Sequence, residues 1–161
     1  MRSKLPASPH RVPDISKIEP FRERLGVWLS YAGSAYYQAY REALKPVRLR
    51  PSWVTALAFI TRQPGITQSQ LGRFMAINRA SAMALAANLE SEGLVSRTPA
   101  QGRNQTILAL TPQGATALRE ACDIETALTG RIMANFDTQA RSDLIGILQD
   151  ILHAAAREPS D

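Results

Sequence analysis

The chain has 161 residues, a formal net charge of +5 at neutral pH and 45% hydrophobic residues. This length is enough for one domain with a core, and the hydrophobic fraction excludes wholesale disorder. No apolar run approaches the roughly 20 residues that span a bilayer, and the single cysteine, Cys122, excludes an internal disulfide. We therefore expect a cytoplasmic protein with no membrane segment.

The charge is unevenly distributed along the chain. Residues 41–103 contain nine Lys or Arg and three Glu, whereas residues 111–161 contain four Arg and eight Asp or Glu. A basic segment followed by an acidic one favours a polyanion, such as nucleic acid, as the partner of the middle of the chain.

The first third of the chain predicts an arm and two helices. Residues 1–15 contain three prolines and no periodicity, which is typical of a flexible arm. Apolar residues then recur at helical spacing from about residue 18 to residue 44. Pro51 opens a second helix, and the pair Pro64 and Gly65 closes it.

The next segment predicts two short helices joined by a tight turn. Thr67 and Gln70 have the spacing of a capping box at the start of the first helix. Asn78 is a favourable N-cap for the second helix. The inner face of that helix is predicted to be Ala82, Leu85 and Leu89. Together the two helices form a helix-turn-helix.

A β-hairpin and two more helices follow. Gly93 is expected to end the preceding helix in a left-handed conformation. Short β-like runs at 94–95 and 106–110 flank a predicted tip from Thr98 to Asn104. Thr111 and Pro112 begin a long helix that is expected to run to about Phe136, and Asp137 caps the last one. The candidates for burial on the long helix are Ala115, Leu118, Cys122, Leu128 and Ile132.

A hairpin directly after a helix-turn-helix makes the unit winged. Such a module places its second helix in the major groove of DNA and its wing beside the adjacent minor groove. At this point the chain resembles the MarR family of bacterial transcription regulators. The residues that carry the resemblance are 64–72, 88–97 and 110–114.

The resemblance implies a mainly α fold with a small β-hairpin wing (α+β). In this fold a winged helix-turn-helix core is flanked by N- and C-terminal dimerisation helices. We expect residues 16–50 to form the N-terminal dimerisation helix and its connection. The DNA-binding domain, the C-terminal dimerisation helices and a tail are then expected at 51–111, 112–156 and 157–161.

The chain departs from the family pattern in two places. The usual Asp and Arg of the wing fall on Gly102 and Asn104, with Arg103 between them. The pair that stiffens the wing is therefore absent, and we expect Arg103 to probe the minor groove from a more mobile loop. The recognition helix is also rich in alanine, at positions 80, 82, 84, 86 and 87, so specificity is expected to use methyl contacts and DNA shape.

The predicted DNA-binding residues lie on the helix-turn-helix and the wing. They are Arg73, Asn78, Arg79, Ser81, Met83, Arg97, Arg103 and Asn104. For three of them a structural role competes with DNA contact. Asn78 has a capping duty, Arg73 fits a solvated surface, and Arg97 could brace the wing.

All four tyrosines lie between Tyr31 and Tyr40. Aromatic side chains near cations could hold a small aromatic or acidic effector. The candidates are Tyr36, Tyr40, Arg48, Arg50 and Trp53. Packing at a dimer interface explains the tyrosines equally well, and Arg48 or Arg50 could contact DNA phosphates.

The sequence therefore predicts an effector-responsive transcription regulator that binds a pseudo-palindromic operator as a homodimer. The resemblance implies that this regulator is a repressor. The alternative is a winged-helix protein-interaction module. The chain contains no phosphate-binding loop, nucleophile elbow or H-E-x-x-H motif, so we expect no enzyme, and no cofactor is predicted. His10, His153 and Cys122 have no metal-ligand spacing, and Cys122 is expected to be an inert core thiol rather than a redox sensor.

Overall fold

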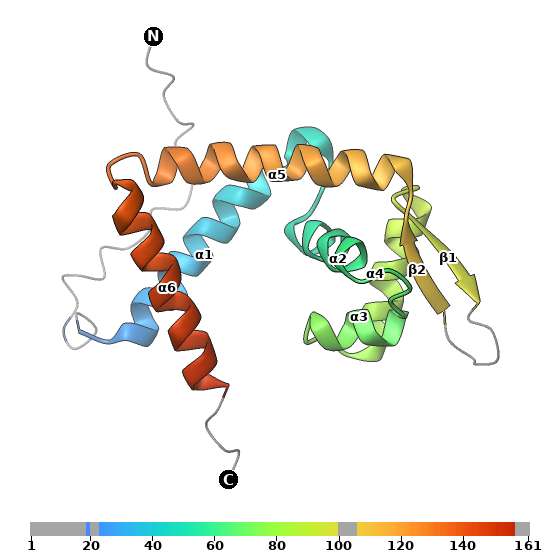
Figure 1. The fold of residues 1–161 in the computed structure, drawn as a ribbon, viewed down its shortest axis with the longest axis horizontal. Coiled ribbons are helices and arrows are strands. Elements are labelled where there is room, and N and C mark those ends of the chain that lie inside the picture. Colours follow the sequence, from blue (N-terminus) through green and yellow to red (C-terminus); the bar gives the residue numbers. More distant parts are fainter. Residues whose placement is uncertain (1–18, 20–22, 100–105, 157–161) are drawn as a thin grey trace.

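The computed structural model describes residues 19, 23–99 and 106–156 (Figure 1). In chain order the elements are α1 (Leu25–Ala43), the 3-10 helix η2 (Lys45–Val47), α2 (Pro51–Arg62), α3 (Gln68–Phe74), α4 (Arg79–Ser91), β1 (Val95–Pro99), β2 (Thr106–Leu110), α5 (Pro112–Ile132) and α6 (Thr138–Ala155). Helix α5 runs along one edge of the molecule. Helices α1 and α6 lie under its C-terminal part, and α2, α3, α4 and the hairpin lie under its N-terminal part.

Side-chain caps fix where four of the helices begin. The Thr67 hydroxyl accepts from the backbone N–H of Gln70 at 3.3 Å, and the Gln70 side chain accepts from the N–H of Thr67 at 2.8 Å. Asn78 and Asp137 accept from the backbone three residues on, at 2.8 and 2.7 Å. Thr111 caps α5 in the same way. The four predicted caps are confirmed, because capping depends on residues close in sequence.

The wing is an antiparallel hairpin in which Val95 pairs with Leu110 and Pro99 pairs with Thr106. The prediction that its tip begins at Thr98 is wrong, since Thr98 and Pro99 belong to β1. Proline is tolerated here because it is the last residue of a strand. Gly93, just before the wing, has a φ of 70°, as predicted.

The core lies mainly in the winged part of the molecule. The largest fully buried side chains are Leu44, Leu57, Ile66, Leu71, Leu89 and Leu108. The predicted inner face of α4 is confirmed, because Ala82, Leu85 and Leu89 are all buried. A hydrogen bond of 2.9 Å from the N–H of Leu108 to the carbonyl of Ile66 ties β2 to the start of the helix-turn-helix.

The helices that were predicted to form the dimer differ from the prediction in their bounds and burial. Helix α1 begins at Leu25 rather than near residue 18, and Pro20 lacks the N–H that a helix interior needs. Helix α5 ends at Ile132 rather than near Phe136. Of its predicted core residues Leu128 is buried, and Ala115 and Leu118 are half-buried. Cys122 and Ile132 are exposed, and the prediction is wrong for them because helical periodicity does not show which positions of α5 another element covers.

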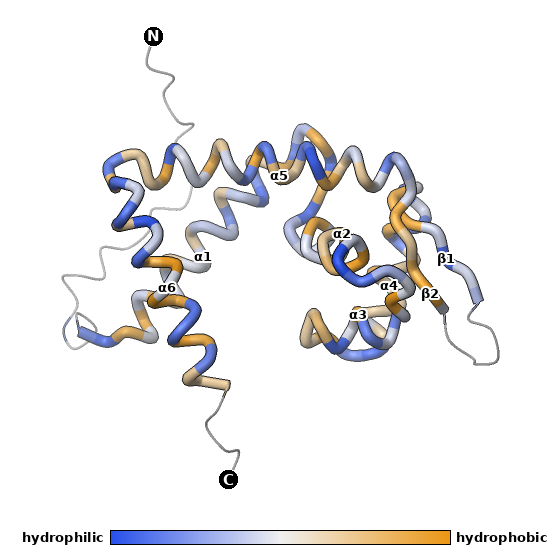
Figure 2. Tube along the Cα trace, in the orientation of Figure 1, coloured by the Kyte–Doolittle hydropathy of each residue, from blue (hydrophilic) through white to orange (hydrophobic). Residues whose placement is uncertain are grey.

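Helices α1 and α6 contribute no fully buried residue. Apolar residues nevertheless recur along both helices (Figure 2). The exposed ones are Leu25, Trp28, Tyr31 and Tyr37 on α1 and Leu144, Ile145, Ile147, Leu148 and Leu152 on α6. None of the helices in the described part of the chain combines the length and the apolar character that crossing a membrane requires.

Candidate nucleic-acid interface

The N-terminal turns of α4 expose both polar and apolar side chains to solvent. Arg79 and Ser81 are exposed, and the Met83 side chain is 50% exposed. Ala82, which lies between them in sequence, is buried against the rest of the domain. The Asn78 side-chain oxygen accepts the cap bond, so its free polar group is the amide NH₂. An uncapped helix start would leave these first backbone N–H groups without partners.

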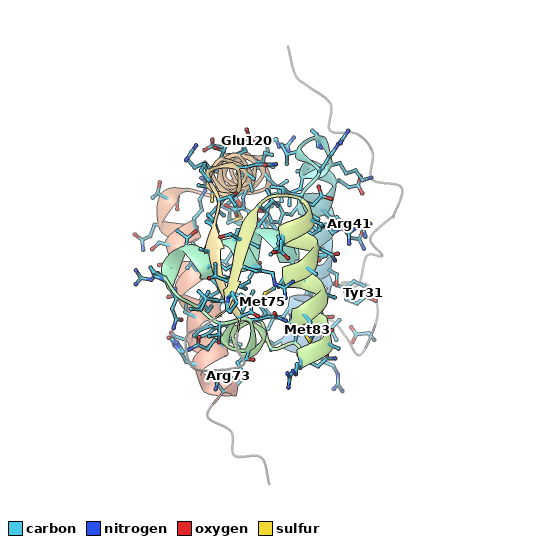
Figure 3. The ribbon with its side chains drawn as sticks, turned by 90° about the vertical axis from the view of Figure 1, so that its right-hand side faces the viewer. Tyr31, Arg41, Arg73, Met75, Met83 and Glu120 are labelled. Atoms are coloured by element: carbon cyan, nitrogen blue, oxygen red, sulfur yellow. The ribbon has the colours of Figure 1, made fainter. Side chains whose placement is uncertain are left out.

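A hollow of about 440 Å³ lies between α3, α4 and the wing. It brings together four residues that the sequence predicted for DNA contact, namely Arg73, Arg79, Met83 and Arg97. Figure 3 shows Arg73 on α3 and Met83 on α4 at this side of the molecule. Three arginines around one hollow create a positive potential of the kind that attracts phosphates.

Some residues of this surface were missed by the sequence argument. Gln68, Ser69 and Thr106 also line the hollow. Gln68 and Ser69 lie in the first turn of α3, where polar residues after a capping box are a usable signal. Thr106 opens β2, and only the hairpin pairing places it here. The predicted contacts Arg103 and Asn104 fall outside the residues that the structure describes.

The Arg97 side chain forms an ion pair with Glu90. Its Nη1 atom lies 3.1 Å from Oε2 of Glu90, in the last turns of α4. Arg97 was predicted to brace the wing, and Glu90 is a partner through which it can do so. The sequence alone did not indicate this partner.

The predicted effector residues fall into two separate groups. In the first, the rings of Tyr36 and Tyr40 are 6.5 Å apart on α1. The Tyr36 hydroxyl donates to Glu125 at 2.5 Å and lies 2.8 Å from the Thr129 hydroxyl, both on α5. Burial, followed by the charge of Glu125, raises the pKa of Tyr40 to about 12. Burial and the hydrogen bond to Glu125 also raise the pKa of Tyr36.

The second group lies where the connection after α1 meets the start of α5. Arg48 and Trp53 line a cavity of about 620 Å³, together with Leu94 and Pro112. The Arg50 guanidinium lies 5.4 Å from the centre of the Trp53 ring. Arg48 has a φ of 55°, a left-handed conformation that is uncommon for a residue other than glycine. Neither tyrosine of the first group lines this cavity.

Comparisons with known proteins give a consistent result. A model of the MarR family matches residues 49–103. A protein of Thauera aromatica, described as a transcriptional regulatory protein for the hcr operon, is 28% identical over 132 residues. The match covers 80% of this chain and 78% of that protein.

Solved structures match over most of both chains. A MarR-family transcriptional regulator from Rhodococcus sp. RHA1 has a TM-score of 0.76 at 25% identity, covering 83% of this chain and 96% of its own. The repressor CouR, known from Rhodococcus jostii RHA1, has a TM-score of 0.79 in a complex with a 23-mer DNA duplex. The identity there is 25%, and 84% of this chain and 97% of CouR are covered.

A second CouR structure holds p-coumaroyl-CoA. It has a TM-score of 0.75 at 27% identity and covers 89% of this chain and 99% of its own. The fold of this chain, a mainly helical structure with a two-stranded wing, agrees with these structures along nearly their whole length. The chain is therefore similar to MarR-family transcription regulators, in its winged part by sequence and over most of its length by fold.

Proposed function

We propose that this chain is a repressor that binds a pseudo-palindromic operator as a homodimer and is released by a small effector. The hollow shared by Arg73, Arg79 and Arg97 carries this proposal, since it joins the start of the recognition helix to the wing. Arg79, Ser81, Met83 and Asn78 are assigned to the major groove. Arg73 and Arg97 are assigned to phosphates, and Arg103 and Asn104 to the minor groove.

The test is fluorescence anisotropy on a DNA duplex that the protein itself selects from a random-sequence pool. The parent should bind it selectively, with an affinity that falls steeply as salt rises. Arg79→Ala should weaken binding about tenfold or more, because a bidentate arginine–guanine contact supplies about 1–3 kcal/mol.

Arg119→Ala is the matched control for this experiment. Arg119 is exposed on α5, and its guanidinium donates to the neighbouring Thr116 hydroxyl. This substitution removes the same charge from α5, a helix that does not line the hollow. Equal weakening by both substitutions would reduce the role of Arg79 to net charge. Absence of any DNA binding at low salt would favour the protein-interaction alternative, which the apolar α4 surface around Met83 suits.

Homodimerisation is supported by the apolar faces of α1 and α6. Their side chains are exposed in the single chain although they have helical amphipathic spacing. A twofold dimer through these helices would place the two recognition helices about 34–36 Å apart, one turn of DNA.

The effector is proposed to be an aromatic acid or a derivative such as a thioester. The binding of p-coumaroyl-CoA by CouR supports this class. We assign its anionic part to Arg48 and Arg50, and its contact with an aromatic wall to Trp53. Tyr36 and Tyr40 are proposed to respond from the α1–α5 contact, where Glu125 would repel a carboxylate placed directly against them.

This assignment predicts which substitutions abolish release. A p-coumaroyl thioester should lower the DNA affinity of the parent, and Arg48→Ala should remove that response while leaving effector-free DNA binding intact. Arg62→Ala, an exposed arginine at the end of α2, is the control. The assignment fails if Arg48→Ala releases DNA at the same thioester concentration as the parent.

A further inference from the structure

One ion pair joins the recognition helix to the wing. Glu90 lies in the last turn of α4, and Arg97 lies at the centre of β1, opposite Leu108 on β2. Arg97 Nη1 donates to Glu90 Oε2 at 3.1 Å. Among the described residues of the winged domain, 51–99 and 106–111, no second ion pair connects two elements. Among these residues, the pair of Glu90 and Arg97 is therefore the one ion pair that joins α4 to β1.

Without Glu90, the surroundings of Arg97 would disfavour its charged side chain in this position. It shares the hollow with Arg73 and Arg79, so two like charges face the same space. Its Nε atom is buried and has no hydrogen-bond partner among the described residues. A buried donor without an acceptor destabilises the conformation that holds it. The carboxylate of Glu90 offsets the repulsion between like charges through Nη1, whereas Nε stays without an acceptor.

The sequence of the wing tip adds to the importance of this pair. Residues 100–105 read Ala-Gln-Gly-Arg-Asn-Gln, with one basic and no acidic side chain. An ion pair within that segment is therefore impossible. Arg97 is the charged residue of β1, and β2 has none.

We propose that Glu90 is a positioning residue for DNA binding. It holds Arg97 across the space between β1 and α4. The recognition helix and the wing then contact DNA in one fixed relative orientation. Glu90 itself touches no DNA and acts through Arg97. This inference rests on the proposed DNA-binding function.

The sign of the effect separates positioning from simple charge. A carboxylate on a DNA-binding lobe repels phosphates, so its neutralisation should strengthen binding if charge alone acts. If Glu90 positions Arg97, the same neutralisation should weaken binding. Glu92 provides a matched control, because it is an exposed glutamate two residues further on with no ion pair among the described residues.

The experiment compares Glu90→Gln and Glu92→Gln in the full chain without effector, on the duplex that the parent selects. We expect Glu90→Gln to bind about two- to fivefold more weakly than the parent, the range that a partly exposed ion pair supplies. Glu92→Gln should bind as tightly as the parent or more tightly. The slope of log affinity against log salt concentration should decrease in magnitude by about one in Glu90→Gln, because Arg97 no longer contacts its phosphate.

A double-mutant cycle with Arg97→Ala tests whether Glu90 acts through Arg97. In that background Glu90→Gln should cause no further weakening. Thermal unfolding of each variant shows that the fold is intact. Equal weakening in both backgrounds, or a Glu90→Gln protein that binds as tightly as Glu92→Gln, would overturn the inference while the parent's DNA binding stands. A parent that binds no duplex would overturn the proposed function as well.

Discussion

Gly114 shows how one residue fixes the junction between the wing and α5. A Cβ atom at this position would lie 1.9 Å from the carbonyl oxygen of Leu94. The same junction holds two hydrogen bonds of Thr111. Its hydroxyl donates to the carbonyl of Gly93 at 2.6 Å and accepts from the N–H of Gly114 at 3.0 Å. The helix can approach the hairpin this closely only because residue 114 has no side chain.

We predict that Gly114→Ala lowers the free energy of unfolding by about 2–3 kcal/mol, because relieving the clash requires a backbone shift. Gly130→Ala on the same helix is the control, since a Cβ there meets nothing within 4 Å. That substitution should raise stability by about 0.5–1 kcal/mol through helix propensity. Urea unfolding at one protein concentration measures both. Equal stability of the two variants would contradict the close approach.

The raised pKa of Tyr40 leads us to predict that the folded chain loses stability at alkaline pH. Burial and nearby Glu125 raise its pKa from 10.0 to about 12, so the folded chain favours the neutral phenol. This contribution is complete below about pH 10 and disappears as the pH rises towards 12. Tyr40→Phe should therefore lose less stability than the parent between pH 9.5 and 11.5 in urea unfolding. Parallel curves for the two proteins would contradict this prediction, because they would show that the pKa of Tyr40 is the same in the folded and unfolded states.

At the scale of elements, the sequence predicted what depends on near neighbours. The caps at Thr67, Asn78 and Asp137 each act over three residues, and all of them are present. The left-handed Gly93 is a local feature of the same kind. The inner face of α4 followed from helical periodicity, which needs no knowledge of the partner element.

Contacts between distant elements were beyond the sequence argument. Tyr36 and Glu125 are 89 residues apart and meet only because α1 packs on α5. The predicted effector set divided into two groups for the same reason. Cys122 fits the apolar pattern of α5, but periodicity does not show whether a given face is covered, and this one is exposed. Site residues on one helix could be predicted, whereas their partners on other elements could not.

At the scale of the whole molecule, the burial is strongly unequal. The core lies in the winged domain and the part of α5 above it, while α6 has no fully buried residue. An apolar helix that covers no core in its own chain is stable when another surface covers it. A second copy of the chain supplies such a surface with matching chemistry. The exposed faces of α1 and α6 would then be the interior of the dimer.

This arrangement predicts that a charged α6 face separates the subunits without unfolding the winged domain. Leu148 and Leu152 are exposed and lie one turn apart on α6. The double variant Leu148→Asp and Leu152→Asp should have the mass of one chain in light scattering, because two carboxylates cannot be buried in an apolar interface. Far-UV circular dichroism should still report a helical protein, since neither side chain belongs to the core.

The matched control is Gln149→Asp, which adds a carboxylate at an exposed polar position of the same helix. It should remain a dimer and keep its operator affinity. The double variant should lose affinity by orders of magnitude, because a single recognition helix engages one half-site and loses the second, linked binding event. A double variant that stays dimeric would place the interface elsewhere. A monomer that binds the operator as tightly as the parent would instead separate DNA binding from dimerisation.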